Sequence, residues 1–132
     1  MPAERIAHVG IVAANGSEMV SFFVEHLGGV LESRTEYPER MQISSMVRIG
    51  ECQLEIMEGT SPNGVVGKFL EKRGPGLHHI SIQVKDLAGL TAELEAKGIP
   101  LIGKDVTDPV VHVAFISPKA TGGVLVEMYE YL

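Results

Sequence analysis

Eight short apolar-rich stretches, most of them bounded by Gly, Pro or Asn turn signals, predict β-strands. They span residues 5–13, 30–36, 41–49, 52–58, 77–84, 101–106, 110–117 and 124–129. Helices are predicted over 17–27 and 65–73, where apolar residues recur three and four apart, and over 87–97. Asn15 or Ser17 is expected to cap the first helix and Asp86 the third, and 118–123 is expected to be a loop.

The order strand, helix, strand, strand, strand occurs twice, which indicates an internal duplication. His8 and His79 stand 71 positions apart, and Glu55 and Glu127 stand 72 apart. Gly74-Pro75-Gly76 is the strongest break between the copies. The sequence therefore predicts one α+β domain over 1–132, made of a module 1–75 and a module 76–132.

Alternation along the strands separates these histidines from the core. Ile80, Ile82 and Val84 form the apolar face of their strand, so His79 points to the opposite face, with Ser81. By the same count His8 shares its face with Gly10, again a small residue two positions on. Each module is thus expected to present one histidine on its polar face.

Two imidazoles and two carboxylates on one concave face would form a site for a divalent metal ion. Nitrogen and oxygen donors without thiolate suit Mn, Co, Ni, Fe or Zn. Four protein ligands would leave two positions of a six-coordinate ion for water or substrate. Each residue taken alone could instead have a purely structural role, since a strand histidine is often a hydrogen-bonded structural residue and a strand glutamate often faces water. The recurrence of the pair favours the metal site.

Three other side chains could belong to a site. Cys52 is expected in the core, on the other strand face from Glu55, and His26 on the surface. His112 either lines the pocket or is satisfied on the sheet, and the second interpretation is preferred.

Composition narrows the class of protein. The net charge of −6 argues against nucleic-acid binding, which requires a basic face. A single cysteine fits a reducing compartment. No apolar run reaches membrane-spanning length and the amino terminus lacks an apolar signal core, so we expect a cytoplasmic protein.

Five further motifs stand in the chain: Thr60-Ser61-Pro62, Lys68-Phe69-Leu70-Glu71-Lys72-Arg73-Gly74, Gly76-Leu77-His78-His79-Ile80, Pro118-Lys119 and Thr121-Gly122-Gly123-Val124-Leu125-Val126-Glu127. With these motifs and the doubled module, the chain resembles the vicinal oxygen chelate superfamily, which includes glyoxalase I, extradiol dioxygenases and bleomycin-resistance proteins. Within it, the chain is most similar to the methylmalonyl-CoA epimerases. The likeness covers essentially the whole chain and is most specific from Ser61 to Ile80.

This resemblance implies paired βαβββ modules that form a cupped mixed sheet around a divalent metal ion. The implied ligands are His8, Glu55 (a place where Gln also serves), His79 and Glu127. The implied reaction interconverts (R)- and (S)-methylmalonyl-CoA through a metal-stabilised enolate, and such epimerases are commonly homodimers. An acyl-CoA thioester is the implied substrate.

Glu127 is the expected base for the proton between carboxylate and thioester. For the second face of that carbon the weaker candidates are Glu55, or Gln53 and His112 acting through water. Ser44 falls near a third-strand glutamate proposed as a base in some members, and a serine cannot take that role at neutral pH. Further departures are Ala7, where the family often has Asp, Thr107-Asp108-Pro109-Val110 in place of a glycine-rich turn, and Ser117 in place of a histidine before Pro-Lys. Lys119 would meet an anionic part of the substrate or is a plain surface lysine, with the second interpretation slightly favoured.

Two alternatives remain beside the epimerase. One is a glyoxalase I-like lyase of the same superfamily, which would use the same metal site on a hemithioacetal. The other is a metal-free ligand-binding protein of the bleomycin-resistance kind. Those proteins typically lack the four ligands, all of which this sequence retains.

Overall fold

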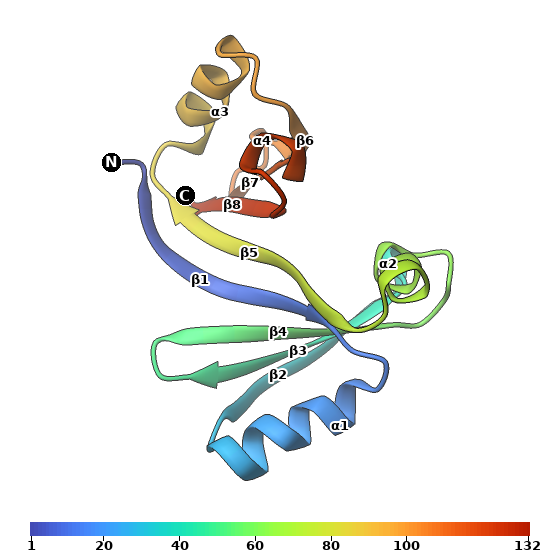
Figure 1. The fold of residues 1–132 in the computed structure, drawn as a ribbon. Coiled ribbons are helices and arrows are strands. Elements are labelled where there is room, and N and C mark those ends of the chain that lie inside the picture. The colour runs from blue at the N-terminus through green and yellow to red at the C-terminus, as the bar shows by residue number, and fades with distance from the viewer. The chain divides into compact units, whose positions relative to one another are not determined.

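A computed structural model describes residues 1–132 (Figure 1). The elements in chain order are β1 (Ala3–Val12), α1 (Gly16–Ser21), η1 (Phe22–His26), β2 (Val30–Tyr37), η2 (Pro38–Arg40), β3 (Gln42–Ile49), β4 (Cys52–Gly59), α2 (Val65–Arg73), β5 (Gly76–Val84), α3 (Leu87–Ala96), β6 (Leu101–Asp105), β7 (Val111–Ile116), α4 (Pro118–Thr121) and β8 (Val126–Tyr131). No helix has both the length and the apolar composition needed to cross a membrane. The predicted α+β class is confirmed.

The chain forms two compact units, each with a four-stranded mixed sheet. Residues 8–78 make up one unit; residues 1–7 and 79–132 make up the other, so β1 contributes to both. The strand order is β2-β3-β4-β1 in the first and β5-β8-β7-β6 in the second. In both, the first strand of the repeat pairs parallel with the last, and the other pairs are antiparallel. The repeated strand-helix-three-strand pattern is therefore present, while the module boundary expected at residues 75 and 76 stays a prediction.

In the unit of residues 8–78, helices cover parts of both sheet faces. Ala13, Val47 and Ile56 are buried beneath the first helical segment, which supplies Met19, Val20, Phe23 and Val24. On the other face, α2 packs Val66, Phe69 and Leu70 against Val12 and Met57. A Cβ atom on Gly67 would lie 2.1 Å from the Ser61 carbonyl oxygen, so α2 can pack this closely against the Ser61 backbone only with glycine at this position. Helix α2 thus covers one end of the face that carries His8 and Glu55.

In the other unit, α3 covers one sheet face and defines the core. Its Leu87 packs with residues of β5, β7 and β8, among them Val84, Ala114 and Met128. Ile80 and Ile82 pack against the same cluster, as the alternation predicts. The residues between them, including Ser81, and the neighbour of Met128, Glu127, therefore point to the opposite face.

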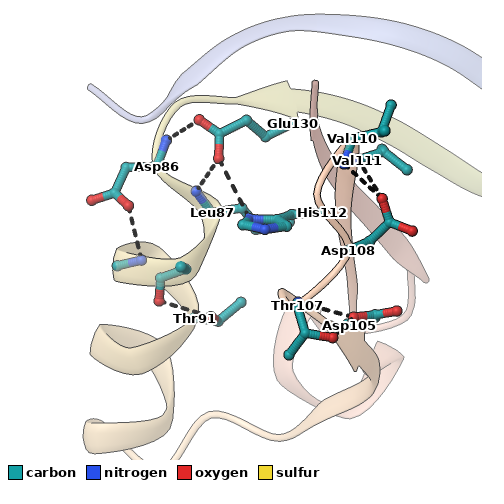
Figure 2. Close-up of polar contacts among 12 residues, drawn as sticks. Asp86, Leu87, Thr91, Asp105, Thr107, Asp108, Val110, Val111, His112 and Glu130 are labelled. Carbon is teal, nitrogen blue, oxygen red and sulfur yellow. Dashed lines mark hydrogen bonds and ion pairs between the residues drawn. The ribbon is translucent and has the colours of Figure 1, made fainter. Parts of the chain in front are cut away.

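The N-terminus of α3 is tied to the last strand by one carboxylate (Figure 2). Glu130 accepts hydrogen bonds from the backbone N–H groups of Asp86, at 2.7 Å, and Leu87, at 3.0 Å. The Asp86 side chain accepts from the Gly89 N–H, which confirms the predicted cap. Asp86 itself has φ of 50°, a left-handed conformation that few non-glycine residues adopt. Glu130 satisfies backbone donors that this turn would otherwise leave without a partner.

We expect Glu130→Ala to lower the free energy of unfolding by about 1–2 kcal/mol, because it removes the acceptor for two helix N-terminal donors. Urea denaturation followed by circular dichroism measures the change. Glu93→Ala, which removes an exposed ion pair with Lys97, is the control and should stay within about 0.5 kcal/mol of wild type. Equal losses in the two variants would show that Glu130 does not anchor α3.

Three predictions about local structure were wrong or incomplete. The helix expected over 17–27 is an α-helix only to Ser21 and then widens into the π-helical turn η1. The loop expected over 118–123 begins with a turn of helix, α4, capped by the Ser117 hydroxyl. Cys52 is exposed, not in the core, because it is the first residue of β4, where its cross-strand partner Ile49 is also exposed.

Candidate metal centre

His8 and Glu55 meet across the parallel pair β1–β4. In this register Gly10 lies opposite Glu55 and His8 lies opposite Gln53, so the imidazole and the carboxylate project from neighbouring strands. His8 Nε2 and Glu55 Oε1 are 3.5 Å apart. Their side chains are only 15% and 16% exposed, which limits competition from water for either group. This unit thus supplies one nitrogen and one oxygen donor to a partly enclosed surface.

The second unit repeats this arrangement with His79 and Glu127. In the parallel pair β5–β8, Ser81 lies opposite Glu127, as Gly10 lies opposite Glu55 in the other unit. His79 is buried, with 6% exposure, and Ser81 is fully buried. The Ser81 hydroxyl donates a hydrogen bond of 2.6 Å to Glu127 Oε1. The predicted correspondence between the two halves therefore extends to the pairing of individual residues.

The chemistry of these donors fits a divalent metal ion. Each unit offers an imidazole nitrogen and a carboxylate oxygen, the ligands that suit divalent transition metals. The one thiol of the chain, Cys52, is exposed at the first residue of β4, and strand alternation places it on the face opposite Glu55. Without sulfur donors, a structural Cys-type zinc site is not the chemistry that this surface supports.

A polar network that the sequence did not reveal holds Gln53. A β-bulge between Leu31 and Ser33 changes the register of β2 and brings Glu32 to β3 and β4. Glu32 accepts hydrogen bonds from Arg48 Nε at 2.9 Å and from Gln53 Nε2 at 2.6 Å. Both hydrogen bonds lower the pKa of the Glu32 carboxyl, and the bond from Arg48 has the larger effect. Gln53 therefore has a structural partner, which argues against its predicted part in proton transfer through water.

His112 faces α3 and not the surface that carries Glu127. It shares a strand face with Ala114, which is buried beneath α3, and its Nδ1 lies 3.9 Å from Glu130 Oε1 (Figure 2). Glu127 lies opposite Phe115, on the other face of the pair β7–β8. His112 therefore lies on the sheet face beneath α3, but its Nδ1 is buried without a hydrogen-bond partner, so the preferred interpretation of a histidine satisfied on the sheet is only partly met. Its position on the face opposite Glu127 argues against the alternative role as a second base.

The remaining candidates lie outside the donor pairs. His26 is exposed, as predicted, and its ring lies 5.3 Å from that of Phe22. Lys119 is an exposed residue of α4. Ser44 is buried in β3 and accepts a hydrogen bond from Gln42 Nε2 at 3.0 Å, so it has a structural partner on the face that carries Glu55.

Sequence comparison assigns the chain to a family. A profile of the glyoxalase/bleomycin resistance protein/dioxygenase superfamily matches residues 7–116. The chain belongs to this superfamily. YqjC, an uncharacterized protein of Bacillus subtilis, is 32% identical over 129 residues, which cover 96% of this chain and 91% of that protein. The human mitochondrial methylmalonyl-CoA epimerase is 28% identical over 132 residues, covering 96% of this chain and 73% of that protein.

A solved structure extends this likeness to three dimensions. A variant of the Streptomyces coelicolor methylmalonyl-CoA epimerase, in complex with 2-nitronate-propionyl-CoA, superposes with a TM-score of 0.86 at 26% identity. The superposition covers 98% of each chain. The chain therefore has the predicted vicinal oxygen chelate fold, and its relatives include methylmalonyl-CoA epimerases.

Proposed function

We propose that this superfamily member is a divalent-metal-dependent epimerase that interconverts (R)- and (S)-methylmalonyl-CoA. The main support is the strand pairing repeated in the two units, in which Gly10 lies opposite Glu55 and Ser81 opposite Glu127, together with the 3.5 Å between His8 and Glu55. Its similarity to methylmalonyl-CoA epimerases over nearly the whole chain supports the substrate class. A coenzyme A thioester with a carboxylate on the adjacent carbon is the substrate that we assign.

In this proposal all four side chains bind one ion, which the donor set limits to Co, Mn, Ni, Fe or Zn. A bound divalent ion supplies Lewis acidity for the negative charge that develops on the thioester oxygen. The chain's own residues must orient the substrate and move the proton. The imidazoles of His8 and His79 must be neutral to bind a cation, so protonation in acid should release it.

We assign Glu127 the removal of the proton between the carboxylate and the thioester. The carboxylate takes the proton as the carbon–hydrogen bond breaks, and delivery of another proton to the opposite face of the carbon completes the epimerisation. That delivery requires a protonated group on the other side of the carbon. With His112 facing α3 and Gln53 bound to Glu32, Glu55 is the candidate that remains from the sequence analysis.

We also propose that the protein is a cytoplasmic homodimer. One cysteine in the chain fits a reducing compartment. The dimer rests on the resemblance to epimerases, and sedimentation equilibrium at micromolar concentration would measure it.

The deciding experiment is deuterium exchange from solvent into methylmalonyl-CoA. Metal-stripped protein with Co²⁺ or Mn²⁺ added back should introduce one deuterium at the carbon between carboxylate and thioester, detected by mass spectrometry. The stripped protein without metal is the control. Exchange confined to a glyoxal-derived hemithioacetal would identify a lyase of the same superfamily. Less than about a tenth of an equivalent of bound metal, with no activation, would identify a ligand-binding protein.

A further inference from the structure

Glu127 has a hydrogen-bond donor that no water molecule can readily replace. Ser81 is fully buried, and its hydroxyl lies 2.6 Å from Glu127 Oε1, a short distance typical of a hydroxyl that donates to a carboxylate. The two residues face each other in the parallel ladder β5–β8, which fixes their separation through the backbone. The hydroxyl therefore holds one carboxylate oxygen at a defined place on the sheet.

The first half of the repeat lacks this hydroxyl. Gly10 occupies the position opposite Glu55 that Ser81 occupies opposite Glu127. Glu55 instead lies 3.5 Å from the imidazole of His8. Ser81 therefore gives Glu127 a hydroxyl donor that Gly10, at the corresponding place in the fold, cannot give to Glu55.

We propose that Ser81 is a positioning residue for Glu127. By occupying Oε1, the hydroxyl restricts rotation of the carboxylate and orients its other oxygen for metal binding and proton transfer. This inference rests on the proposed function, in which Glu127 is a ligand and a base. Outer-shell partners of metal ligands commonly change metal affinity or activity 10- to 100-fold when they are lost.

Co²⁺ binding to the stripped protein tests this role. Titration calorimetry of Ser81→Ala should show a 10- to 100-fold larger dissociation constant for Co²⁺. The visible absorption of bound Co²⁺ should also change, because the geometry of one ligand changes. Ser81→Thr keeps the hydroxyl and should restore both. The control is Thr91→Val, which removes a similarly buried hydroxyl that donates within α3 and should leave Co²⁺ binding unchanged.

A double-mutant cycle separates positioning from a general loss of structure. If Ser81 acts through Glu127, Ser81→Ala should not weaken Co²⁺ binding further in a Glu127→Ala background. An additional 10-fold loss in that background would overturn the inference, as would wild-type affinity and an unchanged spectrum in the single Ser81→Ala variant.

Crystal structures of the metal-free wild type and the metal-free Ser81→Ala variant test the inference without any metal. The Glu127 carboxylate should accept the hydrogen bond from Ser81 in the wild type and should be displaced from that position in the variant. An unmoved carboxylate in Ser81→Ala would refute the positioning role even if the protein is an epimerase. A displaced carboxylate in a protein that binds no Co²⁺ would refute the proposed function and leave the positioning role standing.

Discussion

Replacing His79 with alanine should abolish high-affinity metal binding while the protein stays folded. His79 is buried, with 6% exposure, and in the proposed site it supplies one of the two imidazole nitrogens. Alanine offers no donor in its place. We expect Co²⁺ affinity to fall by more than about 100-fold, beyond the typical cost of losing an outer-shell partner. Titration calorimetry on metal-stripped protein measures the affinity, and far-ultraviolet circular dichroism confirms the fold.

His112→Ala provides the matched control for this experiment. His112 is also a strand histidine of the same unit, with a side chain only 13% exposed, yet it faces α3 and Glu130. Its replacement should lower thermal stability but leave Co²⁺ affinity unchanged. Equal losses of affinity in the two variants would mean that metal binding reports the integrity of the unit rather than ligation by His79. Unaltered affinity in His79→Ala would remove this residue from the donor set.

The position of His79 was predictable because strand alternation depends only on local sequence. Ile80, Ile82 and Val84 are apolar, and their packing beneath α3 directs His79 and Ser81 to the opposite face. The two caps that the sequence predicted are equally local, because Asn15 and Asp86 each accept a hydrogen bond from an N–H three positions on. Such features need no knowledge of which strands become neighbours.

The features that were missed depend on contacts between residues far apart in the sequence. The hydrogen bond from Ser81 to Glu127 requires the parallel register of β5 and β8, which no local pattern specifies. Glu130 reaches the backbone of Asp86 only because β8 ends beside α3. Glu32 reaches Gln53 through a β-bulge. In the sequence alone, Ser81, Glu130 and Glu32 are polar residues without an assigned partner.

The exposure of Cys52 shows a further limit of face counting. Alternation correctly places it on the strand face opposite Glu55, the face on which Ile56 packs into the core. Alternation does not reveal how far along the strand that core extends. At the first residue of β4, beside the turn at Gly50 and Glu51, the cover has ended and the thiol meets solvent.

Replacing Glu127 with glutamine should nearly abolish deuterium exchange into methylmalonyl-CoA. An amide oxygen can still bind a metal ion and accept the hydrogen bond from Ser81, but it cannot accept a proton at neutral pH. Loss of a general base typically costs 10²- to 10⁴-fold in rate, so we expect a fall of about that size. Co²⁺ affinity should change far less than the rate, because an oxygen ligand remains. Mass spectrometry of the substrate and calorimetry of the metal measure the two quantities separately.

Glutamine variants of two other glutamates, Glu55 and Glu130, test whether Glu127 is the base. If Glu55 is the second proton-transfer group, Glu55→Gln should lower exchange by a factor comparable to that in Glu127→Gln. A loss of less than about 10-fold would make Glu55 mainly a ligand, since the amide keeps an oxygen donor. Glu130→Gln, three positions after Glu127 on the opposite face of β8, should affect stability and not exchange. If exchange survives in Glu127→Gln and disappears in Glu55→Gln, the base lies in the first unit. A comparable loss in both would indicate two bases, one for each face of the carbon, which is the arrangement that epimerisation requires.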